Sequence, residues 1–198
     1  MMKNSALVVV DMLYDFIDGS MACKNSENAV NEAVKAIDRL TGSQEGDSGE
    51  EILDTFPILF VCDHHPADHS SFKEFGGIWP AHCVQGTHGG DIHESLRPYA
   101  GEELTFYKGC NPAVEQYSGF EAMNSAGQSL GEILSLLDTT DVYVCGIATE
   151  YCVRSTCEDI LRAGMKVHLL SPALAWVDDE GHKKALKEMA EEGISVEK

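Results

Sequence analysis

Three side chains suited to acid–base or nucleophilic chemistry stand at the ends of apolar segments. Asp11 ends "LVVVD", Lys108 ends "LTFYK", and Cys152 follows "VYVCGIA" in the first turn of an expected helix. A thiol that attacks a carbonyl carbon needs a base to accept its proton, and a cation holds that base in place. Asp11, Lys108 and Cys152 would fill these roles if the fold brings them together.

The position of Cys152 also predicts how its reactivity is set. A helix N-terminus and a nearby cation both lower the pKa of a thiol. We therefore expect the helix and Lys108 to help Asp11 remove the thiol proton. Each residue alone has a structural alternative, because an aspartate at a strand end is often a cap, a lysine is often solvated and a cysteine often belongs to the core.

A second group of polar side chains follows another apolar segment. Asp63, His65, His69 and His82 lie within twenty residues of one another. Asp63 and His65 are two residues apart in an extended segment, so their side chains share a face. One carboxylate with two or three imidazoles suits zinc, iron or manganese, whereas calcium takes oxygen ligands. The alternative is a loop of hydrogen-bonded histidines without a metal.

Six apolar segments predict the strands that carry these residues. They are continuous rather than alternating, which is typical of strands buried on both faces of a sheet. Helical patterns between them predict a three-layer α/β/α, Rossmann-like fold with a mostly parallel six-stranded sheet. The carboxyl ends of parallel strands meet at one edge, so Asp11, Lys108 and Cys152 are expected to converge there. The expected strands are 6–11, 57–63, 104–109, 141–147, 166–171 and, at an edge, 193–198.

The remaining segments are expected to be helices and two loops. Segment 42–51 is polar and rich in Gly and Ser, which predicts a solvated loop. Segment 64–103 is rich in His, Gly and Pro, and we expect it to be ordered and functional, as long loops in compact domains often are. Apolar residues at helical spacing predict the helices 26–40, 127–138, 150–164 and 179–193.

The composition limits the class of protein. The 198 residues include 43% hydrophobic residues, which predicts a single domain over 1–198 with a substantial core. The formal net charge of -19 argues against nucleic acid and anionic membranes as partners. No apolar run has the length of a membrane span, and the N-terminal segment is interpreted as a strand rather than a signal peptide. Seven scattered cysteines without a C-x-x-C pair favour reduced thiols and a cytoplasmic protein.

Four segments contain these residues in a recognisable order: "VVVDMLYDF", "DHHPADHSSF" with "WPAHC", "FYKGCNPAVEQYSGF" and "GIATEYCVRST". In this order and spacing they resemble the nicotinamidases (pyrazinamidases) of the isochorismatase-like cysteine hydrolase family, over nearly the whole chain. The second segment resembles the metal motif of nicotinamidases, which related isochorismatases and carbamoylsarcosine-type amidases generally lack. The resemblance implies the isochorismatase-like hydrolase fold.

The resemblance also implies an activity. It implies hydrolysis of nicotinamide to nicotinate and ammonia, a step of NAD salvage, through a thioester on Cys152, with pyrazinamide as a further substrate. Asp11, Lys108 and Cys152 would be the catalytic residues. The backbone N–H groups of Ala148 and Cys152 would form the oxyanion hole, next to a cis peptide between Ile147 and Ala148.

The metal and substrate residues follow from the same resemblance. One divalent ion, zinc by first choice with iron or manganese as alternatives, would bind the pyridine nitrogen. Its ligands would be Asp63, His65 and His82, with His69 as a candidate fourth ligand or a partner through water. Aromatic side chains would wall the ring, and a homo-oligomer remains open. The expected wall residues are Phe16, Trp79 and Tyr117.

Two departures and two alternatives accompany this interpretation. Leu13 and Tyr14 stand where the first motif commonly has Gln-Asn, and His64 stands where an aromatic residue such as Trp is common, which makes His64 a rival of His65. One alternative is another isochorismatase-like amidase or hydrolase with a retained metal site. The other is a non-enzymatic metal-binding or ligand-sensing domain, against which the intact set of Asp, Lys and Cys argues.

Overall fold

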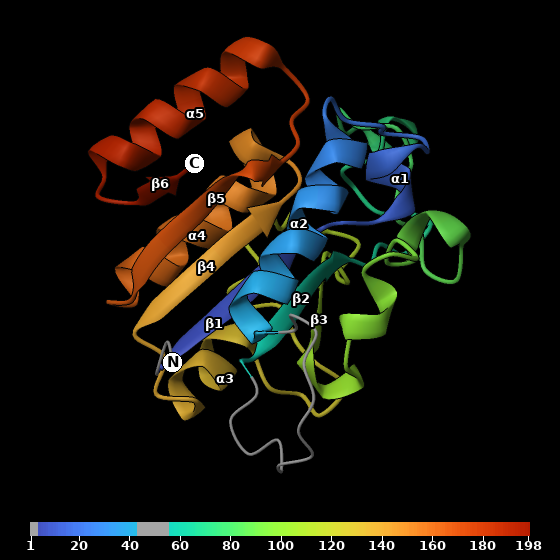
Figure 1. Ribbon diagram of the computed structural model, residues 1–198. Coiled ribbons are helices and arrows are strands. Elements are labelled where there is room, and N and C mark those ends of the chain that lie inside the picture. The colour runs from blue at the N-terminus through green and yellow to red at the C-terminus, as the bar shows by residue number, and fades with distance from the viewer. Residues whose placement is uncertain (1–3, 43–55) are drawn as a thin grey trace.

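The computed structural model describes residues 4–42 and 56–198 and contains one six-stranded sheet (Figure 1). The strand order is β3-β2-β1-β4-β5-β6, and every strand pair is parallel. The predicted α/β fold is confirmed, and the sheet is entirely rather than mostly parallel. The strands are β1 (Ser5–Val10), β2 (Ile58–Asp63), β3 (Thr105–Lys108), β4 (Asp141–Gly146), β5 (Lys166–Leu174) and β6 (Ser195–Glu197).

Helices cover both faces of the sheet and make the three layers (Figure 1). Along β1, Leu7 and Val9 pack in a cluster with α2, whereas Val8 and Val10 pack with α3, α4 and α5 on the other face. This alternation explains why the whole of β1 is apolar and buried. The helices are α1 (Tyr14–Ile17), α2 (Ser26–Thr41), α3 (Leu130–Leu136), α4 (Arg154–Arg162) and α5 (Asp179–Glu191).

Two of the four predicted helices start where expected, two α-helices begin later, and all four end within two residues of the prediction. Segment 127–138 begins its helix only at Leu130, because Ser129 and Glu132 form a capping box. The segment that carries Cys152 starts with a π-helical turn, Thr149–Val153, before α4. The single-turn helix α1 was not predicted. Apart from Gly42, which follows α2, the predicted solvated loop 42–51 lies outside the described residues.

The long segment 64–103 is ordered, as predicted. Its backbone forms isolated bridges between His65 and Val84 and between Phe72 and Trp79. It also contains three short 3₁₀ helices, and a fourth begins at its end and runs up to β3. These are Lys73–Phe75, His88–Gly90, Arg97–Tyr99 and Glu102–Leu104.

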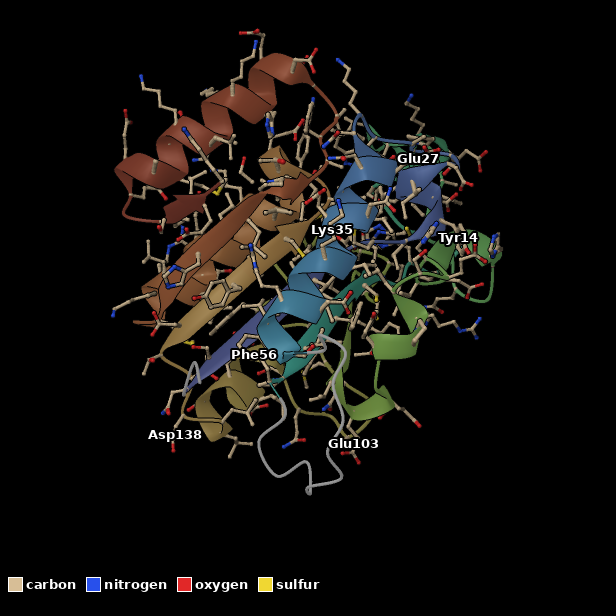
Figure 2. The ribbon with its side chains drawn as sticks, viewed as in Figure 1. Tyr14, Glu27, Lys35, Phe56, Glu103 and Asp138 are labelled. Carbon is tan, nitrogen blue, oxygen red and sulfur yellow. The ribbon has the colours of Figure 1, made fainter. Side chains whose placement is uncertain are left out.

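The outer surface carries much of the acidic excess. Glu27, Glu103 and Asp138 are exposed (Figure 2). Within residues 4–42 and 56–198, every helix is too short or too polar to span a lipid bilayer.

The carboxyl edge of the sheet brings three polar side chains together. Asp63 lies opposite Lys108 in the register of β2 and β3, and Asp11 directly follows β1, between β2 and β4. At the end of β4, Gly146 has a φ of 137°, and a Cβ there would lie 2.1 Å from the carbonyl oxygen of Val10. Only glycine allows this close approach of the two backbones, and the turn that leads to Cys152 begins at this point.

Candidate functional site

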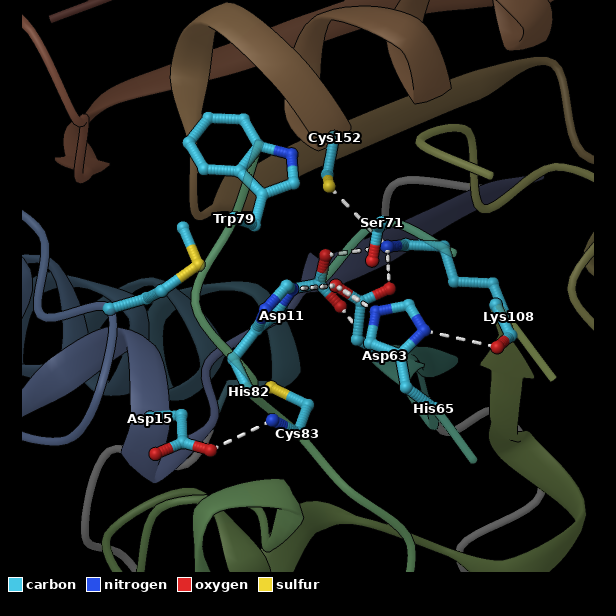
Figure 3. A network of polar contacts seen from close by, with 12 residues as sticks. Asp11, Asp15, Asp63, His65, Ser71, Trp79, His82, Cys83, Lys108 and Cys152 are labelled. Atoms are coloured by element: carbon cyan, nitrogen blue, oxygen red, sulfur yellow. Dashed lines mark hydrogen bonds and ion pairs between the residues drawn. The ribbon is translucent and has the colours of Figure 1, made fainter. Parts of the chain in front are cut away.

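Lys108 is the centre of a buried polar cluster at this edge (Figure 3). Its ammonium nitrogen lies 2.9 Å from Asp11 Oδ2 and 3.3 Å from the sulfur of Cys152, and it donates a hydrogen bond to Asp63 Oδ1. Burial alone would lower the pKa of Lys108, but the charges of Asp11 and Asp63 raise it well above its ordinary value. The structure therefore brings the three predicted catalytic residues together around a permanent cation.

Asp11 lies in an environment that makes it a stronger base. It is fully buried, and its φ of 49° lies in the left-handed region that few residues other than glycine adopt. Its Oδ1 accepts a hydrogen bond of 2.8 Å from the backbone N–H of Asp63. Burial, followed by the charge of Asp63, raises the pKa of Asp11 to about 6, although Lys108 opposes both effects. A carboxylate of this kind is suited to accept and return a proton near neutral pH.

Cys152 lies where it was expected, but the expected direction of its pKa shift is wrong. Burial raises the pKa of the Cys152 thiol well above its ordinary value. The charge of Lys108 lowers this pKa, whereas Asp11 and Asp63 raise it again. Because desolvation of the sulfur outweighs the nearby cation, the resting sulfur is a thiol, and its proton must leave during the reaction.

The turn before Cys152 presents a free backbone donor. The peptide between Ile147 and Ala148 is cis, as the resemblance implied. The N–H groups of Ile147 and Thr149 each donate to a backbone carbonyl at 2.9 Å, whereas the N–H of Ala148 has no acceptor among the described residues. Ala148 and Cys152 line the same pocket. A free N–H beside a nucleophile is what an oxyanion hole requires.

Asp63, His65 and His82 form a group whose ligand atoms all lie within 4.8 Å of one another. The Nε2 atoms of His65 and His82 lie 3.5 Å and 3.9 Å from Asp63 Oδ2. Their Nδ1 atoms donate to the carbonyl oxygens of Gly109 and Pro80, at 3.0 Å and 2.8 Å. These bonds fix the tautomer that leaves Nε2 free for a metal. The donor set therefore fits one divalent transition metal ion.

The two other histidines that the sequence offered as candidate ligands lie outside this group. His69 Nδ1 lies 2.7 Å from the hydroxyl of Ser71, and its Nε2 lies 3.2 Å from the carbonyl oxygen of Val114. Because both ring nitrogens face other partners, the structure does not bring the candidate fourth ligand His69 to Asp63. His64 packs against a tyrosine ring of β3, so His65 rather than His64 faces the carboxylate.

Gly109 allows His65 to lie close to the end of β3. Its φ is 65°, and a Cβ at this position would lie 2.3 Å from Cε1 of the His65 ring. Any side chain at position 109 would displace the imidazole. Lys108 and Gly109 thus serve different halves of the site. The lysine is the cation of the catalytic cluster, and the glycine leaves space for the metal ligand His65.

A narrow pocket leads to both groups. Trp79 donates its indole N–H to the hydroxyl of Tyr117 at 3.2 Å, and its ring stands edge-on to Tyr151 with centroids 5.1 Å apart. Tyr151 was not predicted as a pocket residue, although its position directly before Cys152 was an available signal. The pocket is lined by Asp63, His82, Ala148 and Cys152, by the predicted aromatic residues Phe16, Trp79 and Tyr117, and by Met21, Cys23, Glu115, Tyr151 and Val177.

Comparison with known proteins places the chain in a family. The nicotinamidase/pyrazinamidase of Mycobacterium tuberculosis is 34% identical over 194 residues, which cover 96% of this chain and 97% of that protein. The structure of the pyrazinamidase of Pyrococcus horikoshii in complex with zinc is 34% identical, with a TM-score of 0.81 and coverage of 98% and 99%. PnC1 from L. infantum in complex with nicotinate is 28% identical, with a TM-score of 0.79 and coverage of 99% and 93%. The model of the isochorismatase domain matches residues 5–197, and the chain therefore belongs to the isochorismatase family.

Proposed function

We infer that this protein is an amidase that hydrolyses nicotinamide to nicotinate and ammonia. The inference rests on the position of Asp63, which belongs both to the catalytic cluster and to the group of candidate metal ligands. Its Oδ1 accepts a hydrogen bond from Lys108, and its Oδ2 faces the Nε2 atoms of His65 and His82. One pocket therefore offers a nucleophile and a metal-ligand group to the same small molecule. The activity of the Mycobacterium tuberculosis relative supports this substrate and, as a second one, pyrazinamide.

The first half of the proposed reaction transfers the acyl group to Cys152. As the sulfur attacks the amide carbon, Asp11 takes the thiol proton, and the ammonium group of Lys108 stabilises the charge that develops on the sulfur. The N–H groups of Ala148 and Cys152 receive the oxyanion, and one such donor is worth about 3 kcal/mol in comparable sites. Asp11 then gives its proton to the leaving nitrogen, the C–N bond breaks and ammonia departs.

The second half hydrolyses the thioester. Asp11, again a carboxylate, takes a proton from a water molecule whose oxygen attacks the thioester carbon. The C–S bond breaks, the proton returns to the sulfur and nicotinate leaves. A base with a pKa of about 6 suits both directions of proton transfer, because it is neither a strong acid nor a strong base at neutral pH.

We propose that Asp63, His65 and His82 hold one divalent ion, with zinc as the first choice and iron or manganese as alternatives. Zinc accepts this mixture of carboxylate and imidazole ligands. The zinc in the Pyrococcus horikoshii structure supports the same choice. When bound, the ion supplies a Lewis acid for the pyridine nitrogen of the substrate.

Phe16, Trp79 and Tyr117 are proposed to enclose the pyridine ring. Their support is their position in the pocket that also exposes Cys152 and His82. Aromatic walls bury a flat ring well, and the Trp79–Tyr117 hydrogen bond keeps two of them in a fixed arrangement. With the ring held, the amide carbon stays close to the sulfur, which lowers the entropic part of the barrier.

The cellular setting stays a prediction. All seven cysteines are free, and all but Cys110 are buried, which supports a reducing compartment such as the cytoplasm. A role in NAD salvage follows from the proposed reaction.

The metal dependence of the reaction tests the proposed function. We expect ammonia release from nicotinamide to require a divalent ion, and removal of the ion by a chelator should raise the KM for nicotinamide steeply. The His82→Ala variant should behave in the same way. Benzamide lacks the ring nitrogen, so it should be a poor substrate with or without the ion. A metal-free protein that hydrolyses both amides equally well would show that the histidine loop is structural and that the substrate is another amide.

The pH dependence of the reaction tests the role of Asp11. Asp11 can accept the thiol proton only as a carboxylate, and its pKa is about 6. We therefore expect kcat/KM to be flat near neutral pH and to fall about tenfold for each unit well below the pKa of the base. The measurement needs saturating zinc, because acid also protonates His65 and His82. A profile that stays flat through this range would remove Asp11 from the role of base.

A further inference from the structure

The loop segment that carries His82 is held on one side by Asp15 of the first motif and on the other by Ser20, which follows that motif. Cys83, directly after His82, donates its backbone N–H to Asp15 Oδ2 at 2.7 Å (Figure 3). Ala81, directly before His82, accepts a hydrogen bond of 2.8 Å from the hydroxyl of Ser20. Asp15 Oδ1 also accepts a hydrogen bond of 3.0 Å from the N–H of Ser20. Asp15 and Ser20 therefore form one unit, which we call the clamp.

Cys83 has a backbone conformation that needs outside support. Its φ is 46°, in the left-handed region, although it is not glycine, and its side chain is fully buried. Its carbonyl oxygen accepts a hydrogen bond of 3.0 Å from the N–H of His65. The backbone of Cys83 thus connects Asp15 on one side with the ligand His65 on the other. Loss of the Asp15 carboxylate would leave the N–H next to His82 without its acceptor.

The place of the Asp15 carboxylate is set by two glycines. A Cβ at Gly89 would lie 2.0 Å from Asp15 Oδ2, and a Cβ at Gly19 would lie 2.5 Å from Asp15 Oδ1. At distances this short, a side chain at either position would push the carboxylate out of its place. The carboxylate is therefore enclosed by backbone from two loops, which directs its oxygens to Cys83 and Ser20.

His82 depends on such support more than the other two ligands do. Asp63 is the last residue of β2, and His65 follows closely and pairs with Val84 in a parallel bridge. His82 instead lies in a segment without regular structure. A ligand on a loop needs outside contacts to keep its Nε2 directed at Asp63.

We propose that Asp15 is a positioning residue for the metal ligand His82, acting through the backbone N–H of Cys83, with Ser20 as a second contact. Asp15 does not line the substrate pocket, so its effect on the reaction is indirect. The inference rests on the proposed metal site. It predicts that loss of the clamp weakens metal binding while the catalytic cluster of Asp11, Lys108 and Cys152 keeps its function.

The zinc affinity of an Asp15→Ala variant tests the proposal. Competition with a chromogenic chelator should give a Kd for zinc that is roughly 10- to 100-fold weaker than that of the wild type, the range for lost outer contacts of metal ligands. At limiting zinc the KM for nicotinamide should rise, whereas at saturating zinc kcat should return close to the wild-type value. Asp15→Asn keeps one acceptor oxygen, so its Kd for zinc should lie between those of the wild type and Asp15→Ala. Ser20→Ala should have a smaller effect.

Asp18→Ala is the matched control. Asp18 lies in the same segment, is exposed, and its carboxylate has no hydrogen-bond partner among the described residues. The substitution removes the same charge at a similar place in the chain, so zinc affinity and KM should stay at wild-type values. An equal loss of zinc affinity in Asp18→Ala and Asp15→Ala would show that the effect comes from net charge, and it would overturn the proposal.

Two further outcomes separate the clamp from the site that it supports. A wild-type protein that binds zinc, together with an Asp15→Ala variant of the same affinity, would overturn the clamp and leave the proposed function intact. A wild-type protein that binds no zinc, iron or manganese would overturn the metal site and the clamp with it. If Asp15→Ala does not fold, wild-type affinity in both Asp15→Asn and Ser20→Ala would overturn the proposal.

Discussion

A Cys152→Ala variant is expected to release ammonia from nicotinamide at less than about one ten-thousandth of the wild-type rate, the scale seen when a covalent hydrolase loses its nucleophile. Asp11 and Lys108 remain in place, but no atom is left to accept the acyl group. The fold and the zinc content should be unchanged, because Cys152 is not one of the three proposed ligands Asp63, His65 and His82. The measurement is ammonia release at saturating nicotinamide, with zinc content determined on the same sample.

Cys157 provides the control for this experiment. It lies a helix turn after Cys152, in α4, and it is fully buried in the cluster that packs against the sheet. Burial also raises the pKa of the Cys157 thiol, but without Lys108 or Asp11 beside it. Cys157→Ala should therefore turn over nicotinamide at close to the wild-type rate. If Cys157→Ala is inactive while Cys152→Ala is active, the proposed mechanism names the wrong cysteine as the nucleophile.

A Lys108→Met variant is expected to lose activity and stability together. Its ammonium group lies between the carboxylates of Asp11 and Asp63, and removal of the charge leaves both buried without their cation. Breaking a buried ion pair by removing one partner costs about 3–5 kcal/mol of unfolding free energy. The pKa of Asp11 should also rise further, because Lys108 now lowers it. The base would then be protonated at neutral pH, and turnover should stop.

The pH dependence of this loss has a definite sign. In the variant, Asp11 has a folded-state pKa above its unfolded value, so its ionisation destabilises the fold as pH rises through that pKa. The deficit in unfolding free energy, measured with urea, should shrink as pH falls. A deficit that is equal at acid and neutral pH would contradict the presence of an uncompensated carboxylate.

Lys24→Met is the matched control for Lys108→Met. Lys24 pairs with Asp179 at 2.9 Å, the distance between Lys108 and Asp11, but side-chain exposures of 53% and 56% keep the Lys24–Asp179 pair in solvent. Exposed pairs contribute at most about 1 kcal/mol. The control should therefore keep its activity and almost all of its stability, which separates the loss of a buried cation from the loss of any lysine.

Much of the fold and of the site could be predicted because strand ends are visible in sequence. Continuous apolar runs predicted the six strands, and parallel pairing then required Asp11, Lys108 and the segment before Cys152 to meet at one edge. The same reasoning placed Asp63 and His65 on one face. These features depend on local periodicity, which can be read directly from the sequence, and on a rule of sheet geometry that holds for parallel sheets in general.

The features that could not be predicted depend on how distant segments pack. The raised pKa of Cys152 follows from burial among neighbours that are remote in sequence, so the helix rule alone gave the wrong direction of the pKa shift. His69 lies at a suitable spacing for a ligand, but contacts with Ser71 and Val114 turn its ring nitrogens elsewhere. The contact between Asp15 and Cys83 spans 68 positions and has no sequence signal.

The arrangement of the polar cluster has a consequence for how the chain folds. The contacts from Asp11 to Asp63, from Asp63 to Lys108 and from Lys108 to Cys152 span 52, 45 and 44 positions. Each contact closes a long loop, and loop closure of this kind is slow because its entropy is lost before the contact forms. Burial of either carboxylate as an anion is costly until the lysine arrives from β3. Recovery of activity during refolding should therefore lag behind recovery of helix content, and activity reports the completed assembly of the sheet.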